Sequence, residues 1–310
     1  MRKGATKSSP VYGGGPVEDR GGGTIASAPS VSLRSTPPPQ AGEENCAKLP
    51  QRFAAWFASR GWAPRPHQLA LIEHAARGES VLLVAPTGGG KTLAGFLPSL
   101  IDLASRPPRK PGMPGQRSLH TLYISPLKAL AVDVARNLET PVAEMGLPIR
   151  IETRTGDTSA SKRQRQKTIP PDILLTTPEQ LALLIASRES ARLFENLQAV
   201  VLDELHALYN SKRGDLLALD LARLRTLAPG HRSIGLSATV ADPKPLMDYL
   251  APETHLVRGL AGAAPEIDIL ASDAYVPWSG HLARHAMADV LDAVKKAKTS
   301  LIFVNTRSQA

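Results

Sequence analysis

A glycine-rich run at residues 85–92 has the composition of a phosphate-binding loop. The run reads Ala85-Pro86-Thr87-Gly88-Gly89-Gly90-Lys91-Thr92. It departs from the general GxxxxGK[ST] pattern only at its first position, where alanine replaces glycine. The glycines let backbone N–H groups curl around a phosphate, Lys91 adds positive charge, and Thr92 offers a hydroxyl to Mg²⁺. A glycine-rich turn with a chance lysine is the alternative, and the strand and helix expected on either side disfavour it.

Two adjacent carboxylates, Asp203 and Glu204, directly follow the apolar run 199–202. Acidic side chains at the end of a buried strand are costly unless they meet a cation. Asp203 suits a Mg²⁺ ligand, and Glu204 suits a base that orients and deprotonates an attacking water. A helix N-terminus also favours acids, and that is the alternative. The phosphate loop upstream in the same chain favours the metal and water site.

These motifs lie among short β-rich runs that alternate with helical patterns. The runs are residues 81–84, 119–125, 172–176, 199–202, 233–236 and 255–257. Helix-like apolar spacing occupies residues 92–103, 127–138, 178–187, 215–227 and 242–250. This alternation predicts an α/β fold with a doubly wound parallel sheet covered by helices on both faces. Ligands of such sheets bind at the carboxyl ends of the strands, which is where the motifs fall.

The sequence divides into three parts by composition. Residues 1–45 contain 8 Gly, 6 Pro and 6 Ser and are predicted to be a disordered tail. Residues 46–258 form the predicted α/β domain. Residues 259–310 are predicted to be a linker and the truncated start of a second domain. A strand at 266–270, a helix at 281–296 and a strand at 300–304 are expected in that third part.

Composition excludes several classes of protein. One cysteine, Cys46, excludes a disulfide scaffold and a cysteine-rich zinc module. No apolar run approaches a membrane span and no secretory signal is present, so no membrane partner and a cytoplasmic location, the bacterial cytosol or nucleoid, are expected. The formal net charge is +9, to which the tail contributes 5 basic and 4 acidic residues. The basic excess therefore belongs to the folded part, where it favours a polyanionic partner.

Together the motifs resemble those of a known family. The phosphate loop, the run Asp203-Glu204-Leu205-His206 and the run Ser237-Ala238-Thr239 resemble motifs I, II and III of superfamily 2 helicases of the DExH type. Gln68, in Arg65-Pro66-His67-Gln68, resembles the adenine-reading glutamine of the Q-motif. Residues 125–130, 155–158 and 176–179 resemble the family's nucleic-acid motifs. Residues 303–307 resemble motif IV, at the start of a second RecA-like domain.

A narrower resemblance rests on four further stretches. Residues 125–130, 154–158, 211–215 and 303–310 together resemble the Lhr-type (large helicase-related) group. Within that group they are most similar to the bacterial branch of ligase-associated DExH-box helicases, which act in the DNA damage response.

The resemblance implies a RecA-like P-loop NTPase fold with ATP and Mg²⁺ as cofactors. The implied catalytic residues are Lys91, Asp203 and Glu204, and the implied metal ligands are Thr92 and Asp203. Coupling of the γ-phosphate state to domain closure is implied for His206, Ser237 and Thr239. The implied ATP-binding residues are Gln68, Pro86, Thr87, Gly88, Gly89, Gly90, Lys91 and Thr92.

A nucleic-acid track is expected at the turns that follow other strands. Short or polar side chains there can approach a sugar–phosphate backbone closely. Ordinary helix capping is the alternative for Ser125, Thr158 and Thr177. The candidate contacts are Pro126, Lys128, Gly156, Thr158, Thr177 and Asn305. The expected partner is single-stranded or tailed duplex DNA, and an RNA–DNA hybrid stays open.

The family's activity is an ATP-driven 3′→5′ movement along single-stranded DNA, in DNA repair beside an ATP-dependent ligase and a nuclease. Motifs V and VI, with their arginine fingers, are expected to follow motif IV, and they do not occur in this sequence. The 310 residues alone are therefore expected to hydrolyse ATP poorly or not at all. Two alternatives stay open: a short ATP-gated nucleic-acid-binding protein without hydrolysis, and an RNA-directed helicase.

Overall fold

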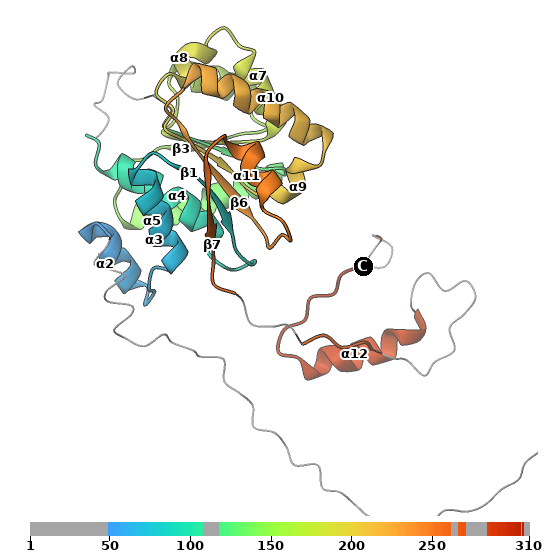
Figure 1. Cartoon of the computed structure of the whole chain (residues 1–310). Coiled ribbons are helices and arrows are strands. Elements are labelled where there is room, and N and C mark those ends of the chain that lie inside the picture. Colours follow the sequence, from blue (N-terminus) through green and yellow to red (C-terminus); the bar gives the residue numbers. More distant parts are fainter. Residues whose placement is uncertain (1–48, 108–117, 262–265, 271–283, 305, 307–310) are drawn as a thin grey trace, which may run out of the picture.

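A computed structural model describes residues 49–107, 118–261, 266–270, 284–304 and 306 (Figure 1). The predicted tail at 1–45 and the predicted contact Asn305 lie outside these residues. Among the described helices, none combines the length and apolar character that crossing a bilayer requires.

Seven parallel strands form one sheet in the order β3-β4-β2-β5-β6-β1-β7. All six strands predicted within residues 46–258 are present, with ends shifted by at most a few residues. The strands are β1 (Ser80–Val84), β2 (Thr121–Ile124), β3 (Ile151–Arg154), β4 (Ile173–Thr176), β5 (Ala199–Leu202), β6 (Arg232–Ser237) and β7 (Thr254–Arg258). The last strand ends at Arg258, where the first domain was predicted to end.

Helices cover both faces of the sheet, which confirms the doubly wound α/β prediction (Figure 1). One core lies under α2 (Gln51–Ser59), α3 (Pro66–Ala76), α4 (Lys91–Ala104) and α5 (Lys128–Glu144). The other lies under α7 (Pro178–Ile185), α8 (Ser190–Phe194), α9 (Leu205–Tyr209), α10 (Lys212–Leu227) and α11 (Lys244–Leu250).

Alternation of side chains along the strands feeds these two cores. In β1, Val81 and Leu83 join the first core, whereas Leu82 and Val84 join the second. Successive strand residues point to opposite faces, so a strand buried on both faces must be apolar throughout. The same reason explains the uninterrupted apolar run of β5. Because every strand is parallel, the turns after all of them lie at one edge of the sheet.

Strand β3 was missed by the sequence analysis because its buried side chains are polar. Glu152 and Arg154 face inward, and both are less than a tenth exposed. Glu152 accepts hydrogen bonds from Arg165 (3.0 Å) and Gln166 (3.0 Å) of α6 (Ala160–Thr168). A hydrophobic-periodicity rule finds no alternation in such a strand.

The two strands predicted after residue 259 are absent. Residues 266–270 and 300–304 carry no regular structure, although η1 (Arg284–Ala286) and α12 (Met287–Lys296) form within the predicted helix. The apolar side chains of these two stretches are exposed, for instance Ile269 at 93% and Phe303 at 86%. A β-rich composition forms a strand only where a neighbouring strand pairs its backbone groups, and the described residues offer these stretches none.

Candidate functional site

The glycine-rich loop runs from the end of β1 to the start of α4, as its motif predicts. Gly88 and Gly90 have φ values of +75° and +74°, which side chains with a Cβ rarely adopt. A Cβ on Gly89 would lie 2.7 Å from the carbonyl oxygen of Pro86. The three glycines therefore keep open a backbone cradle at a helix N-terminus, where phosphates bind well.

Lys91 holds its ammonium group inside this loop. The side chain is 9% exposed, and Nζ donates hydrogen bonds to the carbonyl oxygens of Ala85 (2.9 Å) and Pro86 (3.2 Å). Two neutral carbonyl groups satisfy its hydrogen bonds without neutralising its charge. A buried cation held in this way is a strong point of attraction for an anion that enters the cradle.

The start of α3 lies against the same loop. Gln68, 3% exposed, accepts a hydrogen bond from the backbone N–H of Arg65 (2.9 Å), and its Nε2 lies 3.1 Å from where a Cβ of Gly90 would stand. Arg65 Nη1 donates to the carbonyl oxygen of Gly88 (3.2 Å). The predicted adenine-reading residue is thus beside the phosphate loop.

His67 also contacts the phosphate loop, a role that the sequence did not predict. Its Nε2 lies 2.9 Å from the carbonyl oxygen of Gly89, and burial lowers the pKa of the ring. A neutral imidazole that donates from Nε2 holds this loop carbonyl in place. Gly259, whose N–H donates to Val84, fits beneath the loop because a Cβ there would lie 2.5 Å from that of Ala85.

Asp203 lies at the end of β5, buried to 4% exposure. Its Oδ2 accepts a 2.6 Å hydrogen bond from the hydroxyl of Tyr123, and its Oδ1 accepts one from the backbone N–H of Glu204 (2.9 Å). Burial and the Asp203 charge raise the pKa of Tyr123, so its proton stays on the phenol. Each carboxylate oxygen keeps lone pairs for a further ligand, and hard oxygen donors of this kind suit Mg²⁺.

Glu204 adopts φ +48°, the left-handed region, and no other described non-glycine residue has a positive φ. Such backbone strain clusters at functional sites, because the surrounding structure must hold it in place. In this turn, Glu204 Oε2 lies 3.4 Å from Nε2 of His206.

His206 joins the end of β5 to the end of β6. Its Nδ1 lies 3.2 Å from Ser237 Oγ and 3.4 Å from the backbone N of Ala238, which donates to it. An accepting Nδ1 leaves the proton on Nε2, facing Glu204. The structure therefore brings together His206 and Ser237, two of the three predicted coupling residues. Thr239 is exposed, two residues farther on.

The predicted nucleic-acid residues follow the three strands at the other half of the sheet. Pro126 and Lys128 follow β2, Gly156 and Thr158 follow β3, and Thr177 follows β4. Lys128 Nζ pairs with Asp157 Oδ2 across two of these turns at 2.8 Å. Thr177 is 7% exposed, so its side chain contributes little to the surface.

The capping alternative fails for two of the three residues it named. Leu127, not Ser125, is the N-cap of α5, and Ser159, not Thr158, caps α6. The Thr158 hydroxyl instead accepts from the backbone N–H of Thr155 (2.9 Å) and closes the turn after β3. Thr177 does occupy the N-cap of α7, without a side-chain capping bond.

Arg213 organises these turns and was not among the predicted site residues. Nη1 donates to the carbonyl oxygen of Pro126 (2.7 Å), and Nη2 donates to Glu179 Oε2 (3.1 Å). This hydrogen bonding lowers the pKa of Glu179. Arg213 thus ties the turn after β2 to α7. The only signal in the sequence was the family resemblance of residues 211–215.

A comparison with family models matches residues 65–246, more than half of the chain, to the DEAD/DEAH box helicases. The "Lhr helicase/ probable uracil glycosylase" of Mycolicibacterium smegmatis is 39% identical over 280 residues, which cover 84% of this chain and 18% of that protein. The "ATP-dependent helicase Lhr-Core protein 2" of Thermococcus barophilus is 34% identical over 278 residues, covering 82% of this chain and 32% of that protein. The chain thus spans about a third or less of these relatives.

Among solved structures, the Mycobacterium smegmatis helicase Lhr bound to ssDNA and AMP-PNP superimposes with a TM-score of 0.68 and 34% identity. The match covers 85% of this chain and 35% of that one. The predicted resemblance to Lhr-type helicases is confirmed, whereas the narrower ligase-associated branch stays a prediction. This chain belongs to the DEAD/DEAH box helicase family.

Proposed function

We propose that this chain is the nucleotide-binding motor domain of an ATP-dependent, Lhr-type DNA helicase that moves 3′→5′ along single-stranded DNA. One observation carries the proposal. Strands β5, β6 and β1 are neighbours in the sheet. The Asp203–Glu204 pair, the His206–Ser237 contact and the phosphate loop lie together at the carboxyl ends of these strands. The turns proposed to bind nucleic acid continue that edge after β2, β4 and β3.

The loop and the acidic pair have the donors that Mg²⁺-ATP requires. The backbone of the glycine loop, which includes Pro86 and Thr87, and the Lys91 ammonium would hold the phosphates. Gln68 would contact the adenine base. The Thr92 hydroxyl and the Asp203 carboxylate would hold Mg²⁺, which neutralises charge on the phosphates when bound. Tyr123 orients Asp203 for that role through its 2.6 Å hydrogen bond.

Glu204 would orient the attacking water and take its proton. His206 lies 3.4 Å from Glu204 Oε2 and 3.2 Å from Ser237 Oγ. It would therefore couple the protonation of Glu204 to the position of Ser237 at the end of β6. A movement of Ser237 also reaches the phosphate loop, because the Ser237 carbonyl accepts the backbone N–H of Ala85 (3.2 Å). These contacts support a path between hydrolysis and closure against a second domain.

Strand separation by the complete protein tests the proposal. Duplexes with a 3′ tail should be unwound with ATP, whereas duplexes with a 5′ tail should not. Single-stranded DNA should stimulate ATP turnover more than RNA of the same sequence. Stronger stimulation by RNA would favour the RNA-directed helicase, and nucleic-acid binding gated by ATP without turnover would favour the switch. A role in repair, beside a ligase and a nuclease, is part of the proposal and rests on family resemblance.

Lys128→Ala is expected to weaken single-stranded DNA binding and to lower its salt dependence. Lys128 is 64% exposed, so its ammonium can leave Asp157 for a phosphate. Loss of one phosphate contact should reduce the slope of log K against log salt by about 0.7. The slope is measured by titrating labelled single-stranded DNA at several salt concentrations.

Lys244→Ala is the matched control for that variant. Lys244 is 74% exposed and pairs with Asp248 at 2.7 Å, nearly as Lys128 pairs with Asp157, but it lies on α11 away from the proposed track. Equal salt slopes for Lys128→Ala and the unchanged protein would show that Lys128 does not contact the DNA. An equal decrease in both variants would indicate general electrostatics instead of a defined contact.

A further inference from the structure

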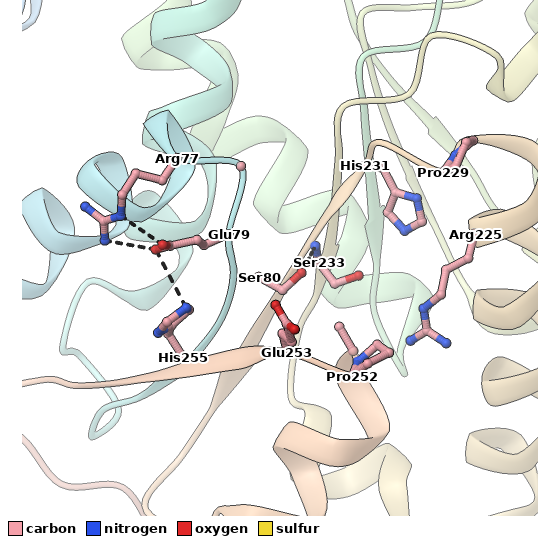
Figure 2. Close-up of a pocket in the computed structure, with 12 residues that line it drawn as sticks. Arg77, Glu79, Ser80, Arg225, Pro229, His231, Ser233, Pro252, Glu253 and His255 are labelled. Atoms are coloured by element: carbon pink, nitrogen blue, oxygen red, sulfur yellow. Dashed lines mark hydrogen bonds and ion pairs between the residues drawn. The ribbon is translucent and has the colours of Figure 1, made fainter.

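A second concave site lies at the opposite edge of the sheet, where the strands begin. A pocket of about 460 Å³ is lined by residues at the starts of β1, β6 and β7, by the loops that precede them and by Arg225 of α10. Figure 2 shows Arg77, Glu79 and His255 together on one side of this pocket, with Arg225 and His231 on the other. The site shares no residue with the proposed nucleotide site, so an inference from it is independent of the proposed function.

Three potential metal ligands converge beside this pocket. His74 comes from the last turn of α3, Glu79 from the residue before β1, and His255 from β7. One nitrogen from each ring and one oxygen of Glu79 all lie within 4.8 Å of one another. The two imidazole rings face each other with centroids 4.9 Å apart. Residues far apart in the sequence thus place two imidazoles and a carboxylate around one point.

Hydrogen bonding accounts for only part of this arrangement. His74 Nδ1 lies 2.6 Å from Glu79 Oε2, which is a hydrogen bond. His255 Nε2 faces the same oxygen at 3.8 Å, which is too long for one. Two imidazole nitrogens therefore face one carboxylate oxygen, and only one of them bonds to it.

We propose that His74, Glu79 and His255 bind a Zn²⁺ ion, with water from the pocket as the fourth ligand. Two imidazoles and one carboxylate are a known ligand set for Zn²⁺ sites that keep an open position. Tetrahedral bonds of about 2.0–2.1 Å place ligand atoms roughly 3.3 Å apart. The 2.6 Å and 3.8 Å separations of the two nitrogens from Glu79 Oε2 lie on either side of that value, and the nitrogens lie within 4.8 Å of each other, so side-chain rotations would bring the three atoms to it.

Arg77 is compatible with the ion and orients its carboxylate ligand. Nε donates to Glu79 Oε1 (2.9 Å), the oxygen that the metal would leave free. The two contacts of Nη2, with Glu79 Oε2 at 2.9 Å and with His74 Nδ1 at 3.0 Å, would be given up, since the side chain is 53% exposed and able to turn away. Ligating carboxylates are commonly held by an outer hydrogen bond of this kind.

The ion would fasten an edge strand of the sheet. β7 pairs only with β1 among the described strands, and its far end leads to Gly259 beneath the phosphate loop. His255 lies near the start of this strand, whereas His74 and Glu79 belong to α3 and the approach to β1. A ligand that binds only the folded arrangement stabilises it. The proposed role of Zn²⁺ is therefore to stabilise the packing of β7 against β1 and α3.

Zn²⁺ binding to the metal-free full chain tests this proposal. A Cys46→Ser background removes the one thiol, which could bind Zn²⁺ elsewhere. We expect calorimetry to give one Zn²⁺ per chain and Co²⁺ to give a tetrahedral absorption spectrum. At Zn²⁺ about 100-fold above Kd, the thermal midpoint should rise by roughly 5 °C.

His255→Gln is the decisive variant, because His255 is half exposed on an edge strand and the chain should fold without it. Its midpoint in chelator should match that of the parent, while its Zn²⁺ affinity should fall more than about 10-fold. Glu253→Gln, which removes an exposed carboxylate from the same pocket, should leave Zn²⁺ affinity unchanged. Zn²⁺ affinity that is equal in His255→Gln and the parent, or no saturable Zn²⁺ binding, would overturn the proposal.

Discussion

Glu204→Gln should reduce ATP turnover by the complete protein about 10²- to 10⁴-fold, the usual contribution of a positioned general base. Glutamine keeps the size and shape of the side chain and can still hold a water, but it cannot accept the water's proton. ATP and DNA affinities should stay within a few-fold of the wild-type values. Formation of ADP and phosphate under single-turnover conditions measures the rate of hydrolysis. Separate binding titrations measure the affinities for ATP and for DNA.

Local geometry makes this substitution informative. The left-handed backbone of Glu204 is held by its neighbours, and glutamine makes the same demand on it as glutamate. The amide oxygen can also accept from His206 Nε2, which lies 3.4 Å from Glu204 Oε2. A loss of nucleotide binding in Glu204→Gln would show that Glu204 is a structural residue of the turn. Glu253→Gln, an exposed acid at the opposite edge of the sheet, should leave turnover unchanged.

The nucleotide half of the site could be predicted because each of its parts is local in sequence. The phosphate loop needs a strand, three glycines, a lysine and a helix, all within residues 80–104. The same holds for the acidic pair after β5. A parallel sheet then brings these local parts together without further information, since every strand ends at the same edge. The strand order itself, β3-β4-β2-β5-β6-β1-β7, leaves no comparable local signal.

Two contacts that the sequence analysis missed join residues far apart along the chain. Tyr123 and Asp203 are 80 positions apart, and Arg213 and Pro126 are 87 apart. Tyr123 lies in an apolar strand, where its ring stacks on Phe96 and its hydroxyl alone serves the site. Composition cannot distinguish that hydroxyl from a core phenol. Arg213 has the same ambiguity, since most arginines that begin helices are solvated.

The strands predicted at 266–270 and 300–304 show the opposite error. Their composition is typical of strands, and yet the described residues there carry no regular structure and expose Ile267 at 82% and Leu301 at 78%. Strand propensity is a preference for a half-buried pleated surface, so it has no effect without a neighbouring strand. The assignment of residues 259–310 to a second domain therefore stays a prediction.

Lys91→Ala is expected to weaken ATP binding by roughly 30-fold to several thousand-fold. Removing one member of a buried, hydrogen-bonded charge pair costs about 2–5 kcal/mol, which converts to that range of Kd. The Lys91 ammonium is 9% exposed and already lies within the loop, so it contributes its full charge without rearrangement of the backbone. A fluorescent ATP analogue, displaced by ATP, measures the change.

Stability must be followed in parallel, because Lys91 also satisfies two loop carbonyls. Losing these hydrogen bonds costs about 1 kcal/mol each, while removing a buried charge offsets part of that cost, so the thermal midpoint without nucleotide should change little. Lys212→Ala is the matched control, since Lys212 is also the first residue of a helix but is exposed. ATP affinity that is equal in Lys91→Ala and Lys212→Ala would refute the assignment of residues 85–92 as the phosphate loop. A selective loss in Lys91→Ala at an unchanged midpoint would establish that the buried ammonium acts on the nucleotide and not on the fold.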